Sequence, residues 1–254
     1  MGKKSILVQV VVLSWSQIMN VLVVNGSGSI GSALVSELSS EGHNVTYTSS
    51  NGSYSNHGES ILWRYSGEES VRELFKDLKS KFNHLDAVVN CLGSIFLKPA
   101  HLTDASDFDQ TVDINLRSSF FIIKEAVPMM KKNGGNMLFF SSAASNIGLA
   151  NHEAIAAAKG GLEGLVKSAA ATYSKNNIRV NAIALGLVES NLSSNIVSNP
   201  MSLEISKKMH SLGRIGSPDS VSKIAKQLII DENSWITGSI INLDGGLATT
   251  KIAS

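Results

Sequence analysis

NVLVVNGSGSIG, residues 20–31, is the stretch that decides the fold. Residues 20–25 are an apolar run with the pattern of a strand buried on both faces, and a glycine-rich turn, residues 26–31, follows at once. Residues 32–41 then have helical periodicity. Glycines in such a turn let the backbone approach a pyrophosphate at a helix N-terminus. The stretch predicts a dinucleotide-binding fold, and the alternative is a plain tight turn.

The rest of the chain continues the alternation of strand and helix. Strands are expected at residues 44–49, 61–63, 85–92, 136–140, 177–184 and, with a closing glycine turn, 236–246. Helices are expected at residues 70–82, 108–130, 155–171 and 220–230. Alternation at a length of 254 residues predicts one α/β domain, residues 19–254, with helices on both faces of a doubly wound, Rossmann-type parallel sheet.

Residues 1–18 are expected to be an appendage to this domain. Lys3 and Lys4 precede an apolar run, residues 6–13, that faintly resembles a secretory signal. No small-residue cleavage site follows, and the run is too short to span a bilayer. Met19 is an alternative start.

Composition limits the kinds of partner and bound group that we expect. Lys plus Arg number 22 and Asp plus Glu number 21, so charge gives no reason to expect nucleic acid or an anionic membrane. The single cysteine, Cys91, excludes an intrachain disulfide and fits a reducing cytoplasm. The six histidines lack metal-ligand spacing, so no metal site is expected.

Residues 141–160 contain several candidate active-site residues. Ser141 and Ser142 are expected where the strand at residues 136–140 ends, and an alanine-rich helix follows. Ile155 and Lys159 are four apart and therefore share one face of that helix.

This segment resembles the active site of the short-chain dehydrogenase/reductase family, which has a serine after this strand and Tyr-x-x-x-Lys at the start of the helix. Ser142 and Lys159 stand at that spacing, and Ile155 fills the tyrosine position. The resemblance covers roughly residues 20–248, and residues 213–218 and 236–246 look like 3-oxoacyl-carrier-protein reductases.

The resemblance implies catalytic roles for Asn115, Ser142 and Lys159. In the family, the asparagine holds a water, the serine steadies the substrate oxygen, and the lysine holds the nicotinamide ribose and activates the tyrosine that supplies a proton. Ile155 has no proton to give, and loss of a positioned acid costs about 10²–10⁴ in rate. His152 or Glu153 could replace it, or both could be solvated loop residues.

The resemblance also implies a set of residues that bind the dinucleotide. The glycine loop is one residue shorter than the family pattern, and Arg64 stands where the family has an aspartate beside the adenine, so it is either an adenine or phosphate ligand or a surface residue. The end of the second strand, residues 49–51, has no acidic side chain to bind the ribose hydroxyls of NAD, which favours NADP. The alternative is a polar turn that is unrelated to the choice of cofactor. The expected set is Gly26, Ser27, Gly28, Ile30, Gly31, Ser49, Arg64, Asn90, Gly93, Lys159, Gly186 and Ser190.

Two functions remain open. The first is an NAD(P)(H)-dependent oxidoreductase on a carbonyl or alcohol, with a 3-oxoacyl thioester as one candidate and the polar loop 187–211 closing over the substrate. The second is a non-catalytic dinucleotide-binding subunit of an active relative. The resemblance implies a homo-oligomer, dimer or tetramer, that uses the helices at 108–130 and 155–171, and a hetero-oligomer is the alternative.

Overall fold

A seven-stranded parallel sheet forms the centre of the protein. The computed structural model describes residues 17–52, 57–230 and 235–251, so nearly all of the expected appendage, residues 1–16, lies outside the described residues. The strands follow the order β3-β2-β1-β4-β5-β6-β7, and every adjacent pair is parallel. They are β1 (Asn20–Val24), β2 (Asn44–Ser49), β3 (Glu59–Leu62), β4 (Ala87–Asn90), β5 (Gly135–Ser142), β6 (Ile178–Leu185) and β7 (Ile240–Leu243). The doubly wound fold expected from the sequence is confirmed.

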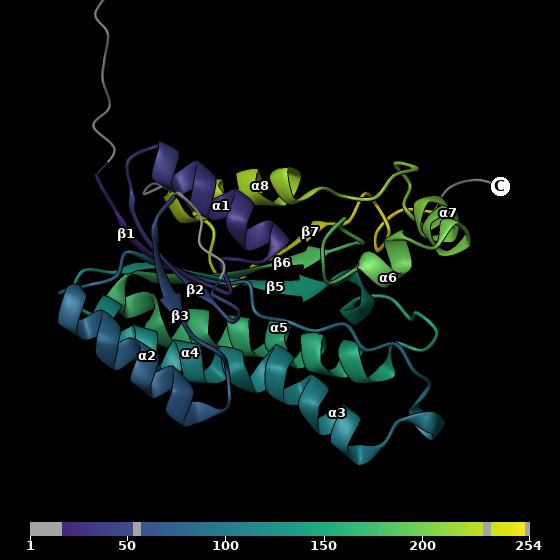
Figure 1. Ribbon diagram of the computed structural model, residues 1–254, viewed down its shortest axis with the longest axis horizontal. Helices are drawn as coiled ribbons and strands as arrows, with labels where there is room; N and C mark the ends of the chain where they lie inside the picture. Colours follow the sequence, from purple (N-terminus) through teal and green to yellow (C-terminus); the bar gives the residue numbers. More distant parts are fainter. Residues whose placement is uncertain (1–16, 53–56, 231–234, 252–254) are drawn as a thin grey trace, which may run out of the picture.

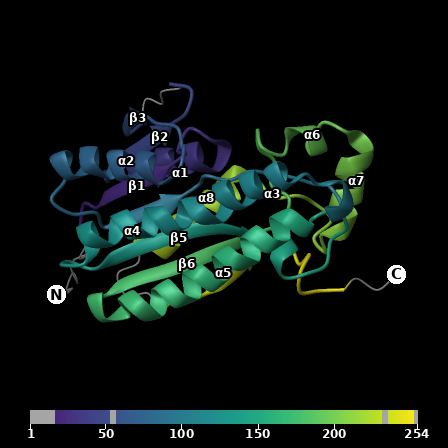
Figure 2. The same ribbon diagram turned by 90° about the horizontal axis from the view of Figure 1, so that it is seen from below.

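Helices cover both faces of this sheet. α1 (Ser29–Ser40) and α8 (Pro218–Ile230) pack together on one face, and α2 (Glu68–Lys81), α4 (Ser118–Met130) and α5 (Glu153–Tyr173) cover the other (Figures 1 and 2). α3 (Ala105–Val112) runs beside α5, and the short α6 (Ser194–Val197) and α7 (Pro200–Met209) lie together beyond one end of the sheet (Figure 2). Three-residue 3₁₀ turns span Ala100–Leu102, Ala143–Ser145 and Ser174–Asn176.

The apolar run of β1 shows why the strands are buried on both sides. Leu22 and Val24 pack into the core beneath α2, α4 and α5, whereas Val21 and Val23 pack into the core beneath α1 and α8. Successive side chains of a strand point to opposite faces, so a continuous apolar run is what a sheet covered on both faces requires.

The predicted helix 108–130 is wrong as a single regular helix. A π-helical turn, Asp113–Arg117, separates α3 from α4. Within it the Asn115 Nδ2 group donates to the Thr111 carbonyl oxygen at 2.9 Å, and that side-chain bond competes with regular helix bonding. π-turns of this kind are frequent at functional sites.

The structure also differs from expectation at two loops. Ser141 and Ser142 belong to β5 rather than following it, because they pair in register with Ala184 and Leu185 of β6. The predicted loop 187–211 contains α6 and α7. Asn199 begins α7, its Oδ1 accepting a hydrogen bond from the Ser202 amide at 3.1 Å, and Pro200 occupies the first helical position.

Within the ranges the structure describes, none of the helices is both long and apolar enough to cross a membrane.

Candidate active site

A cavity of about 480 Å³ opens at the carboxyl ends of β1, β4, β5 and β6. The strand order reverses between β1 and β4, and ligands of doubly wound sheets bind outside the strand ends at such a point. The cavity is lined by residues 25, 28–31, 91–95, 115, 140–142, 155, 159, 185–188 and 190–193.

The turn after β1 forms one wall and fits a pyrophosphate. Asn25 has φ of 57°, a left-handed conformation that asparagine tolerates better than most residues. A Cβ on Gly31 would lie 2.7 Å from both the Asn25 carbonyl oxygen and the Gly26 Cα, so only glycine fits where α1 packs on the turn. α1 starts without a side-chain cap or an acidic residue in its first turn. Its first N–H groups can therefore donate to an anion.

Asn115 and Lys159 both lie beside Gly93 at the cavity wall. A Cβ on Gly93 would lie 3.3 Å from Asn115 Oδ1 and 3.7 Å from Lys159 Nζ. Asn115 is buried, its Oδ1 accepts from the Ser94 amide at 3.1 Å, and its Nδ2 donates to Ser94 Oγ at 2.8 Å. These bonds fix the amide at the cavity wall, where the bare Gly93 backbone leaves room for a ligand.

Lys159 is a buried cation. Its Nζ donates to the Phe140 carbonyl oxygen at 2.7 Å, and the residue is 8% exposed. Burial disfavours the charged ammonium and lowers the pKa of Lys159 to about 8. Ser142, also in the lining, is half-buried, and its Oγ accepts from the Ala144 amide at 3.2 Å. The hydroxyl proton of Ser142 is thus available to a ligand in the cavity.

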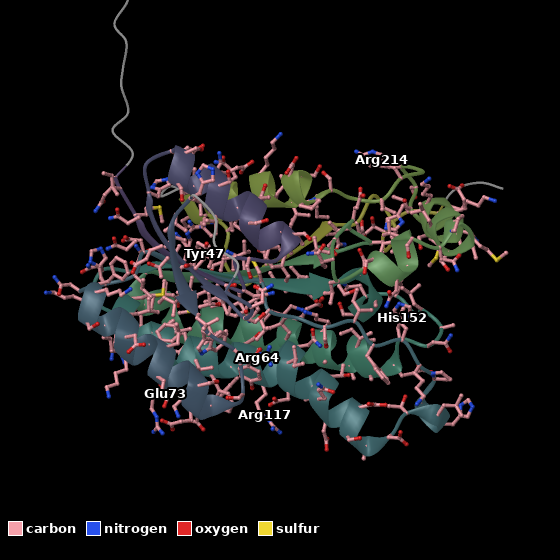
Figure 3. The ribbon with its side chains drawn as sticks, viewed as in Figure 1. Tyr47, Arg64, Glu73, Arg117, His152 and Arg214 are labelled. Carbon is pink, nitrogen blue, oxygen red and sulfur yellow. The ribbon has the colours of Figure 1, made fainter. Side chains whose placement is uncertain are left out.

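Ile155 lines the same cavity one helical turn before Lys159 and is 5% exposed. The two suggested substitutes for a missing acid do not line it. His152, which is labelled in Figure 3, precedes α5, and its Nδ1 bonds the Ala150 carbonyl oxygen at 2.7 Å. Glu153 is exposed on the first turn of the helix. An apolar side chain therefore occupies the part of the wall where the family resemblance implies a proton-donating tyrosine.

Six of the residues expected to hold a dinucleotide, besides Lys159, line the cavity: Gly28, Ile30, Gly31, Gly93, Gly186 and Ser190. Five others do not: Gly26, Ser27, Ser49, Arg64 and Asn90.

Four of the residues outside the lining have other surroundings. A Cβ on Gly26 would lie 2.5 Å from the Tyr47 Cβ, so Gly26 is required by packing against β2. Ser49 Oγ donates to Asn51 Oδ1 at 3.0 Å, and Asn90 Nδ2 donates to Ser119 Oγ at 3.1 Å. Arg64 is an exposed residue (Figure 3). Their roles in binding a dinucleotide stay predictions.

Glu163 is a buried residue that the sequence reasoning missed. Its Oε1 accepts from Ser141 Oγ at 2.7 Å, from Ser145 Oγ at 2.5 Å and from Asn146 Nδ2 at 3.4 Å. The carboxylate thereby ties the end of β5 and the following turn to α5, which fixes the neighbourhood of Ser142. Its position four residues after Lys159, on the same helix face, was the available signal.

In the part of the chain that the structure describes, no group of three or more His, Cys, Asp or Glu side chains is placed to hold a metal ion.

Comparison with known proteins points to one family. Residues 24–248 match the family described as enoyl-(acyl carrier protein) reductase. A chloroplastic tropinone reductase homologue of Arabidopsis thaliana is 30% identical over 244 residues, covering 91% of this chain and 76% of the relative.

Solved structures share the fold of this chain. Ligand-free aldohexose dehydrogenase of Thermoplasma acidophilum superimposes with a TM-score of 0.86 at 23% identity, covering 93% of this chain and 96% of its own. ElxO with NADP bound gives a TM-score of 0.84 at 26% identity, covering 92% and 100%.

Proposed function

Because the chain belongs to the short-chain dehydrogenase/reductase family of NAD(P)-dependent oxidoreductases, we propose that it exchanges a hydride between NADP(H) and a carbonyl or alcohol carrying an apolar group. Ile155 makes the reaction slower than it would be with a tyrosine. The observation that carries the proposal is the cavity itself, which combines Ser142, Lys159 and Asn115 with the glycine turn after β1.

Named residues of this chain would hold the dinucleotide. The turn at residues 25–31 and the uncapped start of α1 would accept its pyrophosphate, and Lys159 would donate to a ribose hydroxyl. When bound, the reduced nicotinamide supplies the hydride. The acid-free end of β2 and the NADP in ElxO, a relative at 26% identity, support NADP as the preferred form.

The substrate oxygen would meet the Ser142 hydroxyl, which can donate a hydrogen bond as negative charge develops. Besides Ile155, the apolar side chains of Ile95, Leu187 and Leu192 line the cavity. A carbonyl attached to an alkyl or acyl chain suits such walls, since apolar surface leaves water on binding. A 3-oxoacyl thioester is one member of that class.

Ile155→Tyr tests the proposal, with Ile155→Phe as the matched control that adds a ring without a hydroxyl. Purified proteins are titrated with NADPH and NADH by fluorescence and assayed on a panel of ketones, alcohols and 3-oxoacyl thioesters. We expect the proteins to bind NADPH more tightly than NADH. We expect kcat to rise by about 10²-fold in Ile155→Tyr and not in Ile155→Phe. Failure to bind either dinucleotide, or an equal gain for phenylalanine, would contradict the proposal.

A second function is favoured by Ile155 alone: a non-catalytic subunit that binds dinucleotide beside an active relative. It predicts binding without turnover in the wild-type protein and a mixed oligomer with that relative. Turnover by the pure protein that disappears in Ser142→Ala would exclude it.

We also propose a homo-oligomer, a dimer or tetramer, formed through α4 and α5 as the family resemblance implies. Light scattering on the purified chain measures its mass, and a monomer at micromolar concentration would contradict this assembly.

A further inference from the structure

Reduction of a carbonyl to an alcohol consumes one proton besides the hydride, and a side chain in the cavity could donate it. Of the described residues that line the cavity, only Cys91 and Lys159 carry a readily titratable side chain. Burial raises the pKa of the Cys91 thiol to about 12, and a thiol is a weak hydrogen-bond donor. An efficient general acid has a pKa near the working pH, so the thiol is poorly suited to the task.

Lys159 is placed to reach a ligand in the cavity. It lies one helical turn beyond Ile155 on the same face of α5, and both line the cavity wall. An ammonium group has three N–H donors, and the Phe140 carbonyl oxygen engages one of them at 2.7 Å. A Cβ added to Gly93 would lie 3.7 Å from the nitrogen, so the glycine keeps a side chain from contacting the ammonium on that side.

The surroundings of the ammonium make it a better acid than an ordinary lysine. Burial lowers its pKa to about 8, so it is protonated at neutral pH and gives up its proton more readily than an exposed amine. Asn115, Ser141 and Ser142, which face the cavity from neighbouring elements, are uncharged. Among titratable groups, Cys91 lines the same cavity, and Glu163 lies one turn further along α5, where its carboxylate bonds Ser141.

We propose that Lys159 is the proton donor of the reduction, in place of the tyrosine that Ile155 replaces. The inference rests on the proposed function. As the carbonyl carbon accepts a hydride with its electron pair, the carbon–oxygen π pair moves onto oxygen. An N–H bond of Lys159 then breaks, its electron pair stays on nitrogen, and the proton forms the new O–H bond directly or across one water. The neutral amine recovers a proton from solvent.

The test compares Lys159→Arg and Lys159→Met with the wild-type protein. Arginine keeps a cation that can hold a dinucleotide but does not release its proton in the working range, and methionine removes the charge at similar length. Lys167→Met, an exposed lysine on the same helix, is the control.

For the wild type we expect kcat for reduction to fall as pH rises through about 8, and a lysine ¹³Cε resonance that titrates near that pH and disappears in Lys159→Arg. Lys159→Arg should lose about 10²-fold or more in kcat and lose this pH dependence, while NADPH affinity by fluorescence changes less than about tenfold. Lys159→Met should lose the same activity, and Lys167→Met should match the wild type.

Three results would overturn the inference. The first is an unchanged pH profile in Lys159→Arg, and the second is loss of NADPH binding together with activity, which would assign the lysine to holding the dinucleotide alone. The third is turnover by Ile155→Tyr with none by the wild type. That result refutes Lys159 as the donor but supports the proposed function, whereas absence of turnover in both proteins refutes the proposed function as well.

Discussion

Lys159→Met should make the protein more stable at neutral pH. Folding buries the ammonium and lowers its pKa from 10.5 to about 8. At about 1.4 kcal/mol per pH unit, this corresponds to about 3 kcal/mol of destabilisation. Methionine removes that cost but also the hydrogen bond to the Phe140 carbonyl oxygen, worth about 1 kcal/mol. The net gain is about 2 kcal/mol, or roughly 4–8 °C in Tm for a chain of this size.

The gain must depend on pH in a defined direction. Below pH 8 the lysine is protonated in both the folded and unfolded states, so its full cost is present. Between pH 8 and 10.5 the unfolded chain binds more protons, so the stability of the wild type rises with pH and the advantage of the variant shrinks. Between pH 7 and 10 the difference should fall by about 2 kcal/mol.

Denaturant unfolding of Lys159→Met and the wild type at pH 7, 8.5 and 10 measures this difference. Lys167→Met removes an exposed lysine of the same helix and should change the free energy of unfolding by less than about 0.5 kcal/mol at each pH. A variant less stable than the wild type at pH 7, or an advantage that persists unchanged to pH 10, would refute the reasoning.

Two further substitutions test the supports of the cavity. Glu163→Ala removes the acceptor of three side-chain donors and should lower the free energy of unfolding by about 1–3 kcal/mol. Glu163→Gln keeps an acceptor oxygen and should retain most of the wild-type stability. Equal losses for the two variants in chemical denaturation would contradict this. His210→Leu removes the ring whose Nε2 accepts from the Leu187 amide at 3.1 Å and whose Nδ1 bonds the Ser206 carbonyl oxygen at 2.6 Å. It should release α7 and speed proteolytic cleavage of residues 187–211, and an unchanged cleavage rate would count against that role.

Periodicity predicted most of the fold because each strand and helix has its own local pattern. β2 was located to the residue, and α5 was expected at 155–171 against an observed Glu153–Tyr173. The four-residue spacing of Ile155 and Lys159 predicted that they share one face of the helix, and both line the cavity.

What the sequence missed depends on contacts between distant segments. Ser141 and Ser142 extend β5 because β6 offers partners at that level, which no local pattern encodes. Asn115 bonds Ser94 across 21 residues of sequence, and Glu163 bonds Ser141 across 22. The start of α7 could have been predicted from local sequence, because Asn199 followed by Pro200 is a typical helix beginning. The scarcity of apolar residues around it favoured a loop instead.

The π-helical turn at Asp113–Arg117 inserts one extra residue between α3 and α4, which would otherwise form one continuous α-helix. Removing a single residue there would restore regular α-helical hydrogen bonding, and α3 and α4 would keep nearly the same rotation about the axis, because a π-turn accommodates its extra residue within one wider turn. α3 would therefore keep its face toward α5, and the change would fall on the turn that carries Asn115. A change of length at this turn would thus alter the cavity wall at Asn115 more than it would alter the packing of the helices on either side.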